Sequence, residues 1–223
     1  KGSKKYPKPT DISQIVDAIG GDFNASTSKE ATEFYIKAEK HHFDLIFDVL
    51  SDVVLNPLFK ETELNKEKGV IVEEINQYED MPASQVENHL EEIMWPDSTL
   101  GWEILGTRQS IRKMKRSNVL KYKNAFYQPS NVILGISGNF DLKQALERIK
   151  NTWGKLKNKK TPKHKHKETT QKKSNLTVIH KDTQQAHFAL GFKSFDHASK
   201  KNAATMLLAN ILGGNMSSRL FVE

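Results

Sequence analysis

The chain has 223 residues, of which 37% are hydrophobic, and this suits one large domain or one domain with part of a second. Cysteine is absent, which excludes disulfide bonds and thiolate metal sites, so any metal ligands must be His, Asp or Glu. The formal net charge of +7 lies almost entirely between Lys155 and Lys173, where there are nine lysines and one acid, while the other 25 basic and 26 acidic residues nearly cancel.

The first elements follow a polar start, KGSKKYPKPT, which lacks the apolar centre of a signal peptide. Thr10 is a favoured N-cap residue, and the apolar residues after it recur at helical spacing until Gly20 and Gly21. Residues 23–28 and 32–38 are predicted as two strands joined by a short polar turn. The apolar stripe from Phe43 to Val54 then predicts a helix that Pro57 stops.

The remaining elements are read from the same two periodicities. Helices are predicted over 61–78, after Pro82, and over 107–114, 117–126, 141–154 and 198–212. Strands are predicted over 131–138, 175–181 and 185–192. No apolar run approaches the ~20 residues that span a bilayer, so no membrane contact is expected.

This order of elements predicts an α+β fold with a mostly antiparallel sheet and helices packed on one face. Residues 1–154 are expected to form a nearly complete first domain, and residues 175–223 the start of a second, similar domain. Residues 155–174 are interpreted as a lysine-rich linker, because runs of like charge repel and stay solvated. No aromatic residue interleaves these lysines, so no nucleic-acid partner is expected.

The helix over 61–78 contains two notable carboxylates. Glu67 and Glu74 are seven residues apart, so they lie nearly one above the other beside the apolar stripe. A carboxylate in such a place must be paired, protonated or bound to a metal, although an exposed salt-bridged surface with the neighbouring lysines has the same pattern. Gly69 costs about 1 kcal/mol within a helix relative to Ala, which suggests that another group approaches the backbone there.

Five segments, in chain order, form a pattern that runs through most of the chain. They are KGSKKYP, GGDFNASTSKEATEFYIKA, the Glu67–Glu74 helix, LGWEILGTRQSIRKM and YQPSNVILGISGNFD. Together they resemble the first domain of the pitrilysin/insulinase (inverzincin) family of zinc peptidases, which includes bacterial processing proteases and the mitochondrial processing peptidase. HKDTQQAHFALGF and LANILGGNMSSRLFVE resemble the start of that family's second, similarly folded domain.

The resemblance implies one Zn²⁺ bound by two histidines of an H-x-x-E-H motif and by a glutamate of a later helix. By this correspondence Glu74 is the metal ligand and Glu67 supports the site from the next layer of residues. Glu73 is the neighbour with which Glu74 could be confused, but it points about 100° away around the helix.

The histidine motif is expected to lie just before Lys1, together with the glutamate that acts as general base. The eight histidines that are present do not replace it: His41 and His42 start a helix, and His164 and His166 lie among the lysines. The chain alone is therefore expected to be unable to hydrolyse peptides.

Substrate contact is also implied by the resemblance. The family binds a peptide as an added strand at a sheet edge beside the zinc. The matching residues are Asn24, Ala25, Ser26 and Thr27, although an ordinary polar edge strand would look the same.

The predicted function is a zinc metalloendopeptidase that cleaves extended or unfolded peptides, with a second pair of family domains, fused or in a dimer, completing the enzyme. The alternative is a non-catalytic family member that serves as a structural or binding subunit. A cytoplasmic location is expected from the absence of cysteine and of an export signal.

Overall fold

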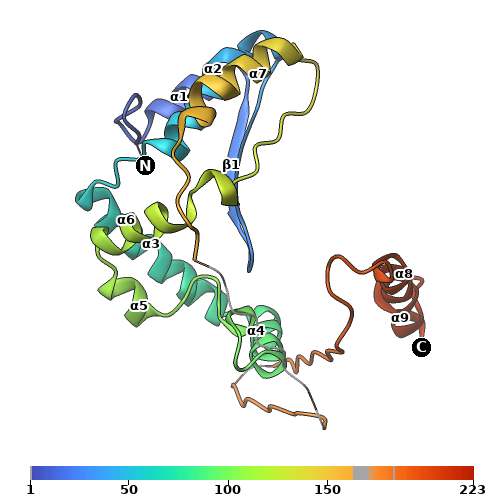
Figure 1. The fold of residues 1–223 in the computed structure, drawn as a ribbon. Coiled ribbons are helices and arrows are strands. Elements are labelled where there is room, and N and C mark those ends of the chain that lie inside the picture. Colours follow the sequence, from blue (N-terminus) through green and yellow to red (C-terminus); the bar gives the residue numbers. More distant parts are fainter. Residues whose placement is uncertain (1, 163–170, 172, 183) are drawn as a thin grey trace. The chain divides into compact units, whose positions relative to one another are not determined.

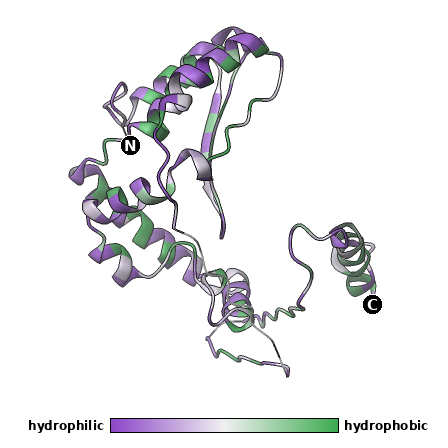
Figure 2. Ribbon diagram, viewed as in Figure 1, coloured by the Kyte–Doolittle hydropathy of each residue, from purple (hydrophilic) through white to green (hydrophobic). Residues whose placement is uncertain are grey.

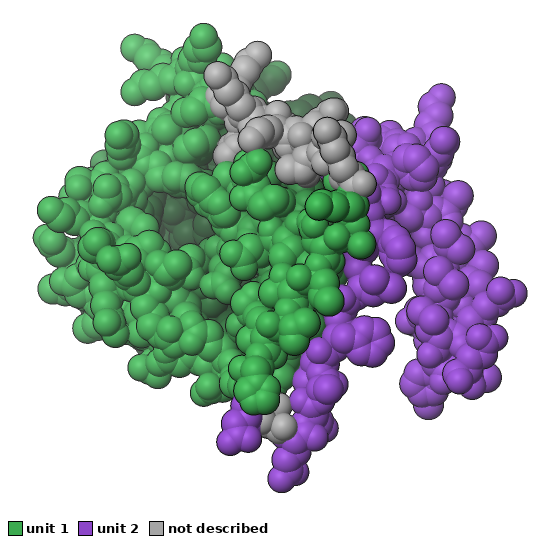
Figure 3. Space-filling view, turned by 90° about the horizontal axis from the view of Figure 1, so that it is seen from below, with its two compact units in different colours: residues 1–181 green, residues 182–223 purple. Residues whose placement is uncertain are grey.

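The computed structural model describes residues 2–162, 171, 173–182 and 184–223. It divides into two compact units, Lys1–Lys181 and Asp182–Glu223, drawn in green and purple in Figure 3. Much of the expected linker, with His164 and His166, lies outside the described residues. The domain division at residues 155–174 therefore stays a prediction.

The first unit contains helices and two strands, labelled in Figure 1. Its elements are α1 (Asp11–Ala18), β1 (Asp22–Thr27), β2 (Thr32–Lys37), η1 (Lys40–His42), α2 (Phe43–Leu55), α3 (Glu61–Glu79), α4 (Pro82–Met94), η2 (Thr99–Gly101), α5 (Arg108–Lys113), α6 (Arg116–Phe126), η3 (Pro129–Asn131), α7 (Leu142–Thr152) and η4 (Trp153–Lys155). The second unit contains α8 (Asn202–Gly213) and α9 (Arg219–Val222). Every helix predicted from the periodicity is present.

The sheet of the described residues is an antiparallel pair in which Asp22 lies opposite Lys37 and Thr27 opposite Thr32. Helix α2 packs against β2, and α1 packs against β1. The α+β class with antiparallel strands is therefore confirmed. No described helix is both long enough and apolar enough to cross a bilayer.

Three predicted strands are not formed. Residues 132–138, 175–181 and 185–192 adopt no regular helix or strand. A strand exists only when a neighbour completes its hydrogen-bond ladder, and no described segment pairs with these residues. The prediction of strands in these three segments is therefore wrong for the described structure.

Two smaller expectations also need correction. The Thr10 side chain makes no capping hydrogen bond; instead Asp11 accepts one from the Lys8 amide at 2.9 Å. At Gly69 a Cβ atom would meet nothing within 4 Å in the described chain, so the expected close approach to the helix backbone is not found there.

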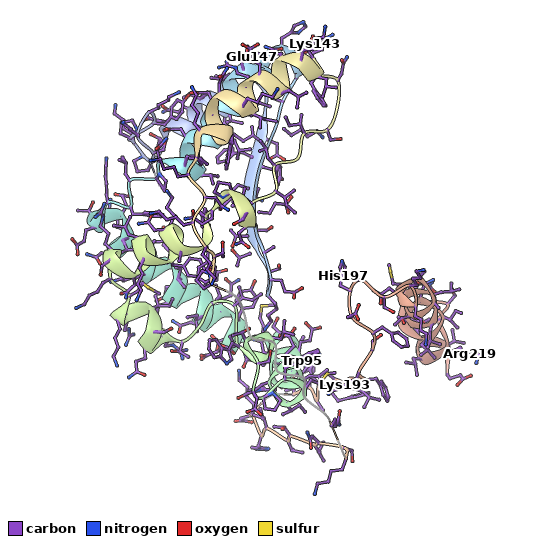
Figure 4. All side chains as sticks on the ribbon, viewed as in Figure 1. Trp95, Lys143, Glu147, Lys193, His197 and Arg219 are labelled. Carbon is purple, nitrogen blue, oxygen red and sulfur yellow. The ribbon has the colours of Figure 1, made fainter. Side chains whose placement is uncertain are left out.

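The buried core of the first unit is small. Its apolar members are Val16, Phe47, Val49, Ile75 and Ala145. The Trp153 indole donates to the Ser51 hydroxyl at 2.9 Å and Arg148 Nε to Asp44 at 2.7 Å, which fastens the α7–η4 segment to α2. The exposed residues of α7 include Lys143 and Glu147, labelled in Figure 4, and also Leu142 and Leu146.

The apolar residues of α8, in the second unit, are largely exposed. Figure 2 colours the hydrophobic residues of α8 green, and Met206, Leu207 and Leu208 are all exposed.

Candidate functional site

Helix α3 presents Glu67 and Glu74 on one side. Both side chains are half-buried, whereas Glu73 is exposed. Seven residues advance a helix by about 10 Å and almost two full turns, so the two carboxylates lie above one another. The structure thus gives the geometry that the sequence predicts for this pair, while their roles remain a prediction.

The three carboxylates differ in their surroundings. Glu67 has one oxygen, Oε2, that is inaccessible to solvent. The Glu73 carboxylate accepts a hydrogen bond from Asn76 Nδ2 at 3.2 Å. Within the described residues, no hydrogen bond or ion pair engages the side chain of Glu74. Glu74 is therefore half-sheltered and chemically available, which is what a metal-binding carboxylate requires.

The start of the chain lies beside the N-terminal end of α3. The Leu58 amide donates to the Gly2 carbonyl at 3.2 Å, and Ser3 forms an isolated β-bridge with Pro57. Residues 2 and 3 are thereby joined to the segment that leads into α3, which begins at Glu61.

Asp52 holds this first segment in place. It is only 4% exposed, and its carboxylate accepts hydrogen bonds from the Lys5 amide at 2.7 Å and from Asn56 Nδ2 at 2.8 Å. Burial raises the pKa of Asp52, but the Ser3 hydroxyl, the Lys5 amide and Asn56 outweigh it, so the pKa lies below its ordinary value. Residues 3–5 are therefore fixed to α2 by a buried charge.

Tyr6 strengthens the same attachment one helical turn earlier on α2. Its hydroxyl donates to Asp48 at 2.9 Å. Burial and this hydrogen bond to a carboxylate raise the pKa of Tyr6 to about 12.

The described residues do not by themselves form a zinc site. A catalytic zinc uses three protein ligands and keeps an open position. No group of three or more His, Asp or Glu side chains able to hold a metal occurs in the described part of the chain. His41 is exposed and pairs with Glu39 at 2.9 Å, and His89 is near Glu92 on its own helix. A single carboxylate such as that of Glu74 can supply one oxygen ligand of such a site, and its role as a ligand stays a prediction.

The outer edge of β1 can be derived from the strand register. The Ser28 amide donates to the Ala31 carbonyl at 2.8 Å, which makes this pair hydrogen-bonded. Hydrogen-bonded and non-hydrogen-bonded pairs alternate in an antiparallel ladder, so Ser26 and Asn24 bond to β2. Ala25 and Thr27 therefore direct their backbone groups outward, where no described strand pairs with them.

Asn24 occupies part of this edge. Its Oδ1 accepts a hydrogen bond from the Ala25 amide at 2.8 Å, which agrees with an Ala25 N–H that does not bond to β2. All four of the residues that the sequence proposes for peptide binding, Asn24, Ala25, Ser26 and Thr27, are exposed. Their role in binding peptide stays a prediction.

Two ion pairs near these elements were not foreseen. Arg108 at the start of α5 binds Glu79 of α3, and Lys29 between the strands binds Glu91 of α4. Their partners are 29 and 62 residues apart in the chain, so no local sequence signal could identify them.

Comparison with known proteins finds one peptidase family over nearly the whole chain. Residues 1–108 match the family described as Insulinase (Peptidase family M16), and residues 113–223 match the Peptidase M16 inactive domain. The uncharacterized zinc protease YmxG of Bacillus subtilis is 35% identical over 215 residues, which cover 96% of this chain and 51% of YmxG. An uncharacterized zinc protease of Streptomyces coelicolor is 30% identical over 229 residues, covering all of this chain and 50% of that protein. The chain spans about half the length of these curated relatives.

Solved structures agree with this placement. The crystal structure of a protease from Helicobacter pylori superimposes with a TM-score of 0.89 at 25% identity, covering 99% of this chain and 54% of that one. The first half of the periplasmic protease PqqL from Escherichia coli shares the fold, with a TM-score of 0.62 at 22% identity over 74% of this chain and 37% of that one. The chain belongs to the insulinase family, peptidase family M16.

Proposed function

We propose that this chain forms part of a zinc-dependent endopeptidase that cleaves extended or unfolded peptides. The observation that supports this most directly is the arrangement on α3, where Glu67 and Glu74 are half-buried on one side and Glu73 is turned to solvent. Membership of a peptidase family and the names of the zinc protease relatives support the same reading.

In this proposal Glu74 binds the zinc through its carboxylate, and Glu67 orients the site from two turns earlier on the helix. The bound metal supplies Lewis-acid polarisation of the scissile carbonyl. The proposal requires the histidines and the general base of H-x-x-E-H from outside the printed residues, so the printed chain by itself is expected not to hydrolyse peptides.

The peptide is held in the proposal by β1. The outward N–H and C=O groups of Ala25 and Thr27 bond to the peptide backbone, which aligns an extended substrate whatever its side chains. A second pair of family domains, fused or contributed by another subunit, completes the chamber around it.

The test compares two neighbouring glutamates in the full-length protein. Glu74→Gln should abolish zinc retention, measured by elemental analysis after dialysis, and cleavage of an internally quenched unstructured peptide. Glu73→Gln is the matched control, because it removes an equal charge from the adjacent, exposed position, and it should retain both. Circular dichroism spectra of both variants should match the wild type.

Two outcomes would count against the proposal. Equal zinc content in the wild type and in Glu74→Gln would remove Glu74 as a ligand. A wild-type protein that binds no zinc and cleaves no peptide would favour the non-catalytic binding subunit.

A further inference from the structure

The turn between β1 and β2 is tied to a distant part of the first unit by one lysine. Lys29 is the first residue of the two-residue connection between Ser28 and Ala31. Its Nζ lies 2.8 Å from Glu91 Oε2 on α4 and also donates to the backbone carbonyl of Trp102. The Lys29 side chain is only 20% exposed, although the turn beside it is open to solvent.

The hairpin needs support from other parts of the first unit. A two-stranded hairpin is at best marginally stable by itself in water. Its other end packs against α1 and α2, near Asp22 and Lys37. Figure 1 shows β1 running from that end toward α4, and every residue of β1 is exposed. The two Lys29 contacts therefore hold the opposite end of the hairpin, at the turn.

The acceptors that Lys29 uses are themselves fixed. Residues 95–102, which follow α4, form a tight series of turns, with the Ser98 amide bonded to the Trp95 carbonyl at 3.2 Å and the Trp102 amide to the Thr99 carbonyl at 3.2 Å. A Cβ at Gly101 would lie 2.4 Å from the Trp95 carbonyl oxygen, so this turn has no spare room. Figure 4 labels Trp95 at the end of α4. Lys29 is thus attached to a compact support.

We propose that Lys29 is a positioning residue for peptide binding, which fixes the far end of β1 so that its outer edge is ordered before a peptide arrives. This inference rests on the proposed function, because it assigns β1 the role of the peptide-binding strand. A strand edge that must be ordered on binding loses affinity by the entropy of that ordering. Removing Lys29 should therefore weaken peptide binding without affecting the proposed metal ligand Glu74, which lies on α3.

The experiment measures steady-state cleavage of an unstructured peptide, together with zinc content, in four variants of the full-length protein. Lys29→Met should raise KM about five-fold, equivalent to about 1 kcal/mol, and leave kcat within about two-fold and zinc content unchanged. Lys29→Arg should restore most of the affinity because it keeps the charge. Glu91→Gln should give a smaller rise in KM, since the bond to the Trp102 carbonyl remains.

Lys37→Met is the matched control. It removes the same charge from the same hairpin at the end that α2 supports, and no ion pair engages Lys37 among the described residues. Its KM should equal that of the wild type. An unchanged KM in Lys29→Met, or an equal rise in Lys37→Met, would overturn the inference while leaving the proposed peptidase intact.

A direct measurement of peptide binding distinguishes failure of this inference from failure of the proposed function. If the wild type does not cleave the peptide, fluorescence anisotropy of the same labelled peptide decides. Weaker binding by Lys29→Met than by Lys37→Met would support the positioning role in a non-catalytic protein. Equal binding, or no binding by the wild type, would refute it.

Discussion

The guanidinium of Arg108 binds both carboxylate oxygens of Glu79, with Nη1 at 2.7 Å from Oε1. Its Nε donates to Asn76 Oδ1 at 2.8 Å, and Lys181 Nζ donates to the Glu79 carbonyl at 2.6 Å. The three Arg108 bonds fix the last turns of α3, the helix that contains Glu74, to the first residue of α5. The hydrogen bonds to Glu79 raise the pKa of the Arg108 guanidinium.

Replacing Arg108 tests whether its bonds to Glu79 and Asn76 affect the zinc affinity of the protein. Arg108→Gln should lower zinc affinity in the full-length protein by about tenfold or less. Groups that hydrogen-bond a ligand directly typically change affinity about 10–100-fold, and Arg108 acts one step further away. Arg108→Lys should recover little, because lysine lacks the fork that matches a carboxylate. Competition with a fluorescent zinc chelator provides the measurement.

The control for Arg108 is Arg112→Gln, an exposed position on the same helix with no ion pair within the described residues. It should bind zinc as the wild type does. Equal zinc affinities for the Arg108 and Arg112 variants would show that zinc binding does not depend on the contact between Arg108 and Glu79.

The buried carboxylate of Asp52 predicts a pH-dependent stability. Its pKa in the folded chain is below the ordinary value of 3.8, so its charge stabilises the fold above pH 3.8, and this contribution is lost as the pH falls through the lower folded-state pKa. Asp52→Asn should reduce the free energy of unfolding by about 2 kcal/mol at pH 7, because hydrogen bonds to a buried charge are replaced by neutral ones. Urea denaturation of the full-length protein from pH 7 to pH 3 measures the difference.

The difference between wild type and Asp52→Asn should shrink only below pH 3.8. Glu30→Gln, an exposed change in the hairpin turn, should leave stability within about 0.5 kcal/mol at every pH. A stability gap for Asp52→Asn that does not depend on pH would contradict this account.

Gly69 provides a stability prediction of the opposite sign. It lies within α3, its φ is not positive, and a Cβ would meet nothing within 4 Å. Gly69→Ala should therefore raise the free energy of unfolding by about 0.5–1 kcal/mol, since alanine loses less backbone entropy in a helix. Thermal and urea unfolding of the full-length protein provide the measurement. Destabilisation would instead indicate that a group outside the described residues packs against Gly69.

The helices were largely predictable because their signals are local. The stripe from Phe43 to Val54 and the stop at Pro57 became α2, which ends at Leu55. Residues 131–138 show the limit of this reasoning. Ile133 is 98% exposed there, and the segment forms no strand, since sheet pairing depends on a neighbour that a periodicity does not identify.

The candidate site was predictable to the same extent. The shared side of Glu67 and Glu74 follows from helix geometry alone, and the structure shows it. The ion pairs of Arg108 with Glu79 and of Lys29 with Glu91 depend on how separate elements of the fold meet. Tertiary packing brings these partners together, so the spacing of residues in the sequence could not identify them.

The Ala25 amide, on the outer edge of β1, already donates its hydrogen bond to Asn24 Oδ1. An approaching chain, whether a substrate or another copy of the protein, must displace this side chain to reach the amide. Unwanted edge-to-edge association is thereby discouraged at the centre of the strand, where a flat, bare edge would invite aggregation. In the proposed function, a peptide that bonds along the whole edge offsets the loss of the Asn24 hydrogen bond. A chain that touches the edge at Ala25 alone only replaces one hydrogen bond with another.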